Sequence, residues 1–440
     1  MTMMDRLLTA GFRHNSRRLT RFARPQPSEL LPAPDPQRRY MLYLHVPFCT
    51  VLCPFCSFHR VCFEEEKARR YYANLRREIR MAFDAGYRFS AVYVGGGTPT
   101  VLPAELTATL ELLQKLGPMQ GISVETNPDD LTPELLSRLK DAGVSRLSVG
   151  VQSLDDRLLK EMDRYGKYGS AREIMQRLER ARGVFTTLNA DMIFNLPHQD
   201  EASLLGDVDR LTRELGLDQV TFYPLMSASS TLRTMLKTMG RVNFDREGRY
   251  YRLILDALPD AYRPASAWCF NARGDMVDEY IIDNDEYLGL GSGSLSYLAG
   301  GLYSSTFSLN HYHRAIESGR FGISRRQALT ARDQLRYHLL MALFGLSLDK
   351  ARAERLHPGF GWKLAPEIAG LKLMGAIRDE GDRLVLTRYG MRVWILIMRE
   401  FFMAVSDFRD LMRHSIREEP GAGPMQSGLA APGTGSAGTQ

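Results

Sequence analysis

The stretch CTVLCPFC, residues 49–56, places three cysteines close together in a chain of 440 residues that has only five. It directly follows the apolar run MLYLHV (41–46), which is typical of a buried strand. Thiols clustered in this way can hold a zinc ion, form a disulfide, act as a reactive group or bind an iron–sulfur cluster. Each of these predicts something different about the rest of the chain.

Six short apolar runs are candidate strands: MLYLHV (41–46), AVYVGG (91–96), ISVETN (122–127), RLSVGV (146–151), LNADMIF (188–194) and QVTFYPL (219–225). Helical patterns lie between them: EEEKARRYYANLRREIRMAF (64–83), ELTATLELLQKL (105–116), TPELLSRLKDAG (132–143) and ASLLGDVDRLTREL (202–215). Strands that alternate with helices predict βαβ units and a parallel sheet. Six such units in a row indicate a barrel or an open part of one.

In parallel barrels the functional groups lie at the carboxyl ends of the strands. The unusual residues of this sequence fall there: the cysteines after the first strand, then GGGTPT (95–100), Glu125, Gln152, Asp191 and Pro224 on or after the next five. Each has a structural explanation by itself, such as a tight glycine turn, a helix cap or a satisfied buried carboxylate. Their convergence on one rim predicts an active site.

The cysteine spacing favours a cluster over the other kinds of site. A structural zinc site needs four ligands, usually from two CxxC-type pairs, but Cys62 is too near the triplet and Cys269 is isolated. An odd cysteine count in a reducing compartment argues against a disulfide framework. Three thiolates, from Cys49, Cys53 and Cys56, suit a [4Fe-4S] cluster with one iron left to bind a small molecule. We interpret Cys62 and Cys269 as ordinary cysteines.

The composition, with 44% hydrophobic and 25% charged residues, is that of a soluble globular protein with one large domain and one or two smaller ones. The sequence has no apolar run of the roughly 18–20 residues that a membrane span requires, and no secretion signal. We therefore predict a cytoplasmic protein without a membrane span. The net charge of +6 is compatible with nucleic acid or a small polycarboxylate as partner, and does not decide between them.

Changes in amino-acid composition along the chain predict five segments. Residues 1–39 are an arginine-rich, proline-containing arm, expected to be flexible, although an organelle transit peptide has the same composition. Residues 40–230 are expected to form the barrel, 231–324 to complete it on the substrate side, and 325–418 to form a C-terminal domain. The Pro/Gly-rich residues 419–440 have too little apolar surface to fold and are expected to be disordered.

The C-terminal segment has the pattern of a small winged-helix-like module. It contains a helical run at 329–345, a short hairpin around RDEGDR (378–383) and the amphipathic helix MRVWILIMREFFMAV (391–405). Because winged helices often bind DNA, a nucleic-acid-binding regulator with a structural cluster is a rival interpretation. The wing carries three acids and two arginines, whereas DNA requires a basic face. We therefore predict no nucleic-acid partner.

These motifs also resemble a known family. CTVLCPFC after a first strand is similar to the radical S-adenosylmethionine (SAM) enzymes. In order and spacing, a longer set of segments resembles the oxygen-independent coproporphyrinogen III oxidase-like family, which includes HemN and the heme chaperone HemW: YLHVPFCTVLCPFCSF (43–58), GGGTPT (95–100), ETNPDDL (125–131), RLSVGVQSLD (146–155), DMIFNLPHQ (191–199) and DEYLGLGSGSLSY (285–297). The resemblance spans about residues 40–415. It implies a partial (β/α)6 TIM-like barrel whose substrate end is covered by a C-terminal winged-helix-like domain.

The resemblance assigns roles position by position. Cys49, Cys53 and Cys56 would hold a [4Fe-4S] cluster, and its open iron would bind the methionine part of SAM. An electron donor such as flavodoxin or ferredoxin is implied, because reduction of the cluster cleaves SAM to methionine and a 5′-deoxyadenosyl radical. The positions matching the family's SAM contacts are Tyr43 beside the open iron, Phe55 at the adenine, Gly95, Gly96, Gly97 and Thr98 along the methionine backbone, Arg164 at the methionine carboxylate, Glu125, and Gln152 and Asp191 at the ribose.

Three reactions remain open within this family: coproporphyrinogen III oxidation, heme delivery, and radical methylation of heme that opens the macrocycle, as in the HutW/ChuW group. TFYPLM (221–226), PASAWCF (264–270) and residues 283–309 resemble the third group. GSGSLS (291–296) stands where the oxidases and chaperones have a GAGAHS type of segment, and Phe58 stands where the oxidases have a fourth cysteine. We therefore predict a heme-degrading methyltransferase, which implies up to two bound SAM molecules.

The residues that contact the substrate are not evident from the sequence. Heme propionates need cations, and the arginine-rich arm or Arg273 could supply them, although solvated arginines are the simpler interpretation. His311 and His313 could ligate heme iron, but a surface or core histidine pair is again simpler. No catalytic residue is assigned.

Overall fold

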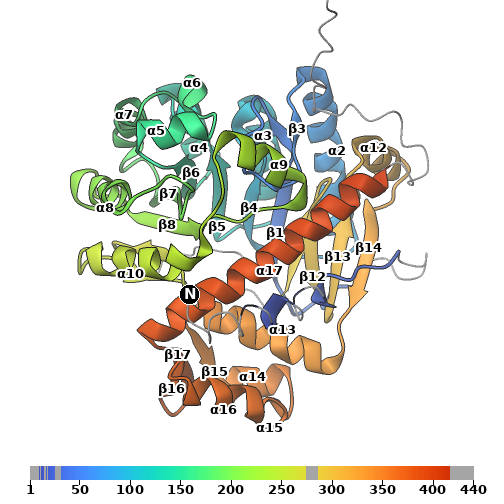
Figure 1. Cartoon of the computed structure of the whole chain (residues 1–440). Helices are drawn as coiled ribbons and strands as arrows, with labels where there is room; N and C mark the ends of the chain where they lie inside the picture. The colour runs from blue at the N-terminus through green and yellow to red at the C-terminus, as the bar shows by residue number, and fades with distance from the viewer. Residues whose placement is uncertain are drawn as a thin grey trace, which may run out of the picture.

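The computed structural model describes most of the chain: residues 9, 11–13, 16, 18–24, 31–273 and 286–416. The predicted tail at 419–440 lies outside the described residues. The centre of the protein is a sheet in which six parallel strands are neighbours in chain order (Figure 1): β1 (Tyr40–Val46), β4 (Phe89–Gly96), β5 (Gly121–Thr126), β6 (Arg146–Gln152), β7 (Thr187–Phe194) and β8 (Gln219–Pro224). These are the six strands predicted from the sequence, and the predicted α/β fold class is confirmed.

Helices lie between these strands in the sequence: α2 (Glu65–Asp84), α3 (Pro103–Leu116), α4 (Pro133–Asp141), α5 (Asp156–Glu161), α6 (Tyr165–Tyr168), α7 (Ala171–Ala181) and α8 (Glu201–Asp209). α2 buries one face, on which Tyr71, Leu75 and Ile79 recur at a spacing of four residues. The helix predicted at 202–215 is α8 followed by a π-helical turn, Arg210–Glu214. The four predicted helices are therefore confirmed, and α5, α6 and α7 are additional.

Both edges of the parallel sheet are extended by strands that were not predicted individually: β11 (Tyr287–Leu290), β12 (Leu295–Leu298), β13 (Gly301–Ser305) and β14 (Ile323–Ala328) beside β1, and β10 (Cys269–Asn271) and β9 (Arg263–Pro264) beside β8. Of these, β11 is parallel to β1 and the others pair antiparallel. The complete sheet has 12 strands in the order β14-β13-β12-β11-β1-β4-β5-β6-β7-β8-β10-β9. The same part of the chain contributes the helices α9 (Ser229–Thr238), α10 (Glu247–Ala257) and α12 (Leu309–Glu317).

A buried carboxyl group links α2 to α12. Glu78 on α2 accepts hydrogen bonds from the Tyr312 hydroxyl and from the backbone N–H of Gly291, each at 2.8 Å. Burial raises the pKa of Glu78 to about 7. This carboxyl therefore fixes the start of the loop between β11 and β12 against the outer helices.

The end of the chain forms a smaller α+β unit at the bottom of Figure 1: α13 (Ala331–Phe344), β15 (Ser347–Asp349), α14 (Lys350–Leu356), α15 (Phe360–Lys363), α16 (Ala365–Leu373), β16 (Ile377–Asp379), β17 (Arg383–Leu386) and α17 (Arg388–Ser415). The three strands pair in the order β15-β17-β16, and β16 and β17 are the predicted hairpin. α17 has 28 residues, so it is much longer than the predicted 391–405, and it crosses diagonally in front of the sheet (Figure 1).

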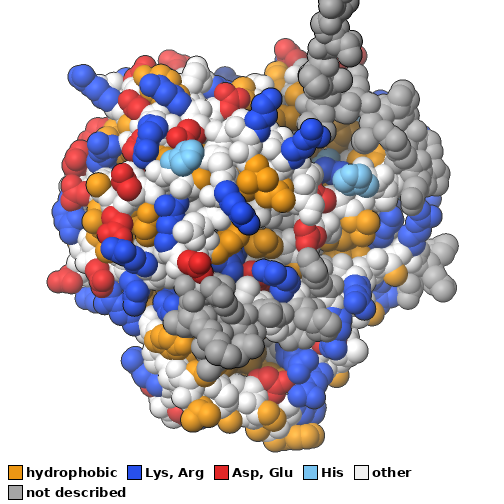
Figure 2. Space-filling model, viewed as in Figure 1, with side chains coloured by type: hydrophobic (Ala, Val, Ile, Leu, Met, Phe, Trp, Pro, Cys, Tyr) orange, Lys and Arg blue, Asp and Glu red, His pale blue; other side chains and the backbone are white. Residues whose placement is uncertain are grey.

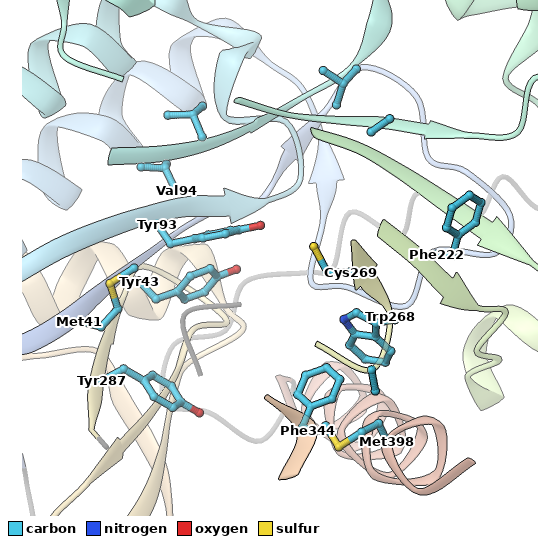
Figure 3. Close-up of a cluster of buried hydrophobic side chains, with 14 of the residues drawn as sticks. Met41, Tyr43, Tyr93, Val94, Phe222, Trp268, Cys269, Tyr287, Phe344 and Met398 are labelled. Atoms are coloured by element: carbon cyan, nitrogen blue, oxygen red, sulfur yellow. The ribbon is translucent and has the colours of Figure 1, made fainter. Parts of the chain in front are cut away.

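Helix α17 is held on the barrel by buried polar and aromatic contacts. The guanidinium of Arg399 lies 2.6 Å from the Glu247 carboxylate and 2.9 Å from that of Glu400, and all three side chains are buried. Nearby, Trp268 lies beside Phe344, as Figure 3 shows, with ring centroids 4.5 Å apart. The barrel and the C-terminal unit therefore share one core.

The described part of the N-terminal arm packs against this helix. The Phe22 ring stacks on Phe408 of α17, with centroids 4.1 Å apart and an interplanar angle of 23°. Ala23 forms an antiparallel bridge with Arg326 of β14. The arm thus brings an aromatic side chain to the inner face of α17.

Charged side chains of both signs are interspersed over the face seen in Figure 2. Among the described residues, no helix combines the length and apolar character needed to cross a bilayer.

Candidate functional site

A pocket of about 320 Å³ opens at the carboxyl ends of the parallel strands. Twelve of the thirteen predicted site residues line it: Tyr43, Cys49, Cys53, Phe55, Cys56, Gly96, Gly97, Thr98, Glu125, Gln152, Arg164 and Asp191. Gly95, the thirteenth, lies directly behind, since a Cβ there would be 2.7 Å from the Glu125 carboxyl group. The structure therefore brings the predicted site residues together, while their individual roles stay predictions.

The loop that carries the three cysteines is closed at its base. β2 (Phe48–Cys49) pairs with β3 (Val61–Cys62), so the chain returns to its starting point after the cysteines. Inside this loop, one guanidinium nitrogen of Arg60 donates to the carbonyl oxygens of Cys53 and Cys56, both at 2.7 Å. Arg60 therefore fixes the backbone between the second and third thiols.

The three thiols are partly or fully buried, Cys53 the most. Burial, followed by the proximity of Cys56, raises the pKa of the Cys49 thiol to about 12, and Thr98 donates to its sulfur at 3.6 Å. A thiolate is stable in such a place only beside a compensating positive charge. No group of three or more Cys, His, Asp or Glu side chains in the described part of the chain is arranged around a single metal ion. A [4Fe-4S] cluster does not require its three cysteines to surround one ion, because each thiolate binds a different iron.

The glycine turn after β4 allows a close approach that side chains would prevent. Gly96 has a φ of +116°, and a Cβ there would lie 2.6 Å from the His45 ring. A Cβ on Gly97 would lie 2.7 Å from the carbonyl oxygen of Phe48. The turn therefore packs its bare backbone against the start of the cysteine loop.

Two partly buried carboxyl groups form the floor of the pocket. Glu125 accepts a hydrogen bond from the Tyr93 hydroxyl at 2.9 Å, and burial, with a further contribution from Asp191, raises its pKa to about 7. Asp191 accepts from the Ser148 hydroxyl at 2.7 Å and the Asn189 amide at 2.8 Å, and burial also raises its pKa. Acceptors of this kind suit a ligand that carries hydroxyl or ammonium donors.

A buried arginine faces them beside the cysteines. Arg164, only 3% exposed, donates from Nη1 to the Cys53 sulfur at 3.3 Å and from Nη2 to the Asn127 side-chain oxygen at 3.3 Å, and it lies over the Tyr168 ring. Its Nε is one of twelve buried side-chain polar atoms of the described residues that have no hydrogen-bond partner. Gln152, at the end of β6, has a φ of +76°, which turns the chain away from the strand at the pocket. A buried cation with a spare donor fits an anionic group of a ligand.

A histidine relay connects Tyr43 to the loops around it. The Tyr43 hydroxyl donates to Nδ1 of His45 at 2.9 Å, and Nε2 of His45 donates to the His59 carbonyl at 2.8 Å. Nε2 of His59 in turn donates to Ser292 at 3.2 Å, since the Ser292 hydroxyl proton is given to the Thr306 carbonyl. Burial lowers the pKa of His45 to about 4 and that of His59 well below its usual value, so both rings are neutral.

The opposite wall of the pocket is apolar and comes from distant parts of the chain. Its side chains are supplied by α17, by the arm and by the strands β12 and β13: Phe22, Leu295, Leu302, Phe401, Phe402, Val405 and Phe408. Tyr43, Tyr93 and Tyr287 also line the pocket, and Figure 3 shows their hydroxyl groups pointing to the same side. The pocket therefore has one polar side and one apolar side.

Comparison with known proteins identifies the family of the chain. The radical SAM superfamily profile matches residues 43–211. A heme chaperone HemW from Lactococcus lactis is 30% identical over 70% of this chain and 82% of its own length, and an anaerobilin synthase from Escherichia coli O157:H7 is 30% identical over 81% and 82%. An oxygen-independent coproporphyrinogen III oxidase from Paracoccus denitrificans is 30% identical over 69% and 72%. The chain belongs to the HemN/HemW family of radical SAM proteins.

The solved structure of coproporphyrinogen III oxidase HemN from Escherichia coli superposes with a TM-score of 0.66 at 21% identity, covering 84% of this chain and 91% of that one. At this identity the match establishes the fold, and the predicted TIM-like barrel of the HemN/HemW family is confirmed.

Radical SAM proteins use a [4Fe-4S] cluster and SAM, and the residues of this pocket fit both groups. Cys49, Cys53 and Cys56 reach the pocket from one closed loop. The unpartnered Nε of Arg164 and the close backbone of the glycine turn lie in the same pocket. We propose that these three cysteines hold the cluster and that the polar wall binds SAM.

Several pocket residues were missed by sequence reasoning. Phe22, Arg60 and Arg409 line the pocket. The only predicted element close to one of them is the amphipathic helix at 391–405, which ends shortly before Arg409. Two of the considered substrate contacts lie elsewhere. Arg273 is exposed, and His313 is buried with its Nδ1 2.8 Å from the Asn74 amide, so the simpler interpretations of both are supported.

Proposed function

We propose that this HemN/HemW family member methylates heme and opens its macrocycle without oxygen. The observation that carries the proposal is the identity of two residues that line the pocket. Leu295 and Phe58 stand where the oxidase and chaperone patterns have a histidine and where the oxidase pattern has a fourth cysteine, and both lie in the pocket wall. The alignment with an anaerobilin synthase, which covers 81% of this chain, supports the same assignment.

The side chains of the pocket would bind SAM and the macrocycle and would exclude water. The bound cluster and SAM would supply the electron and the carbon-centred oxidant that the chemistry needs. Arg164 would neutralise the carboxylate of SAM, while Glu125 and Asp191, as partly buried acceptors, would fix its amino and hydroxyl groups. The apolar wall would keep water away from the reacting carbon and accept the flat face of the macrocycle.

The Leu295 and Phe58 positions also bear on the coproporphyrinogen reaction. Leucine and phenylalanine offer neither a proton carrier nor a ligand at those two points of the wall. A reaction that relied on the histidine or on the fourth thiol would lack that group here. The pocket wall is thus better suited to bind an apolar ring than to decarboxylate a propionate side chain.

The test is an anaerobic reaction of the reconstituted protein with reductant, SAM and heme, followed by mass spectrometry. We expect a methylated, ring-opened tetrapyrrole and 5′-deoxyadenosine with the wild type, and neither with Cys53→Ala. Leu295→His changes the apolar wall and leaves the three cysteines intact. We expect it to reduce the amount of product while the iron content of the protein stays unchanged. Coproporphyrinogen III is the competing substrate, and its oxidation would contradict the assignment.

A heme chaperone is the second candidate, because a HemW protein covers 70% of this chain at 30% identity. A chaperone would return intact heme, bound in stoichiometric amount, with SAM unconsumed. Three further points stay predictions. These are an electron donor such as flavodoxin or ferredoxin, a cytoplasmic location and the lack of a nucleic-acid partner.

A further inference from the structure

The three tryptophans of the chain differ in the surroundings of the indole ring. Trp362 is 74% exposed, whereas Trp394 is buried and donates its N–H to the Leu340 carbonyl at 3.0 Å. Trp268 is only 1% exposed, and its Nε1 has no hydrogen-bond partner in the described part of the chain. Because an unpaired buried N–H costs free energy, such a group in a folded protein points to a partner that the protein itself does not supply.

Trp268 lines the functional pocket. Of the twelve unpartnered buried side-chain atoms of the described residues, two belong to residues that line this pocket: Nε of Arg164 and Nε1 of Trp268. In the view of Figure 3, the indole nitrogen lies on the edge of the ring that is turned toward the labelled tyrosines of the pocket. Arg164 is proposed to bind SAM, so the indole N–H is a donor for a second ligand.

The indole is held firmly in place. The Phe222 N–H donates to the Trp268 carbonyl at 2.8 Å, and the neighbouring Ala267 N–H donates to the Phe344 carbonyl at 3.0 Å. The indole ring packs between two other rings, with centroids 4.5 Å from that of Phe344 and 5.5 Å from that of Phe402. The donor is therefore fixed in position before a ligand binds, which limits the entropy that binding must cost.

The neighbours of Trp268 indicate the chemistry of this ligand. On one side, Tyr223 lies with its ring centroid 5.0 Å away, and its hydroxyl donates to Asp191 on the polar side of the pocket. On the other side is Phe402 of the apolar wall. A ligand at this junction needs a flat apolar body and a hydrogen-bond acceptor on its rim. In heme the pyrrole nitrogens bind the iron, so the acceptors on the rim are the propionate carboxylates.

We propose that the indole N–H of Trp268 donates to a propionate carboxylate of the tetrapyrrole, while Phe402 packs against the macrocycle. This inference rests on the proposed function, because it names a substrate contact of the same site. The hydrogen bond fixes which edge of the macrocycle lies at the junction of the two walls. It also determines specificity, since a macrocycle without an acceptor there leaves the N–H unpaired.

The test uses Trp268→Phe, which removes the N–H and keeps an aromatic ring. Heme is compared with iron octaethylporphyrin, which has the same macrocycle but only ethyl groups on its rim. Both are titrated by absorbance into the reconstituted protein. We expect Trp268→Phe to weaken heme binding about tenfold and the binding of the alkyl porphyrin by less than about twofold.

Trp394→Phe is the matched control. It makes the same change in a buried tryptophan that does not line the pocket and whose N–H already has a partner, the Leu340 carbonyl. The ratio of the two porphyrin affinities should therefore stay at its wild-type value in Trp394→Phe. A change in this ratio as large as that in Trp268→Phe would contradict the inference.

Equal weakening of heme and the alkyl porphyrin by Trp268→Phe would show that the indole acts only through packing, and would overturn the inference, as would unchanged heme binding. Loss of SAM binding alone, measured by equilibrium dialysis of radiolabelled SAM, would also overturn it. If the wild type makes the ring-opened product and Trp268→Phe binds heme normally, the inference fails while the proposed function stands. If heme binding depends on the N–H as expected but the wild type forms no product, the inference stands and the methyltransferase assignment fails. A wild type that does not bind heme would refute both.

Discussion

Replacement of Gly97 by alanine should separate the glycine turn from the cysteine loop. The added Cβ would lie 2.7 Å from the carbonyl oxygen of Phe48, 2.8 Å from the carbonyl carbon of Pro47 and 2.9 Å from the carbonyl oxygen of Val46. All three are backbone atoms, so no side chain can rotate away to relieve the overlap. The turn itself must move.

That movement acts on two hydrogen bonds that join the turn to the loop. The Gly97 N–H donates to the Val46 carbonyl and the Thr98 N–H to the Phe48 carbonyl, each at 2.7 Å. Each of the two bonds contributes about 0.5–1.5 kcal/mol, and overpacking costs about 1–3 kcal/mol, so we expect a loss of about 2–6 kcal/mol in the free energy of unfolding. Because Cys49 follows Phe48 directly, cluster binding should fall as well.

The assay is urea unfolding together with iron content per chain after anaerobic reconstitution. Gly361→Ala is the control, because a Cβ there meets no atom within 4 Å, and its effect should stay within about 1 kcal/mol. Wild-type stability and iron content in Gly97→Ala would refute the reasoning, since they would show that the turn can move away from the loop at little cost.

Two further predictions concern buried charges. Arg399→Met leaves the carboxylates of Glu247 and Glu400 without their buried partner, and we expect it to lower the free energy of unfolding in urea by about 3–5 kcal/mol. Arg388→Met removes an exposed ion pair and should lower it by less than about 1 kcal/mol. Similar losses in both variants would contradict the burial argument. For Glu78, the folded pKa of about 7 lies above the usual 4.5, so the folded state holds the proton more tightly and stability falls as pH rises through this window. In Glu78→Gln, the decrease in the free energy of unfolding between pH 4.5 and 7 should be smaller by up to about 3 kcal/mol. If the stability of the variant and of the wild type depends on pH in the same way, Glu78 is not the titrating group.

The six parallel strands could be predicted because strands buried on both faces are continuous apolar runs in the sequence. β1, for example, is buried at all seven positions. The site could be predicted because the parallel topology fixes where strand ends meet, so residues as far apart as Cys49 and Asp191 fall on one rim.

The apolar wall could not be predicted in this way. Phe22 and Phe408 stack although most of the chain separates them, and neither lies in a pattern that names its partner. The last nine residues of α17, DFRDLMRHS (407–415), are too polar to extend the apolar run at 391–405, so the helix was expected to end before Phe408 and Arg409. β12 and β13 have only four and five residues, and together they contain one glycine and three serines, so neither forms a continuous apolar run.

The C-terminal helix α17 lines the pocket and also holds the cysteine loop. The hydroxyl groups of Ser57 and Ser406 lie 2.9 Å apart, and Arg413 donates to the Phe58 carbonyl at 3.1 Å. Ser57 directly follows Cys56, and Ser406 lies between the pocket-lining Val405 and Phe408. The loop that carries the thiols and the wall proposed to bind the tetrapyrrole are therefore attached to the same two turns of one helix. A substrate that displaces this helix must also shift the loop, so the position of the thiols and the occupancy of the apolar wall are mechanically linked.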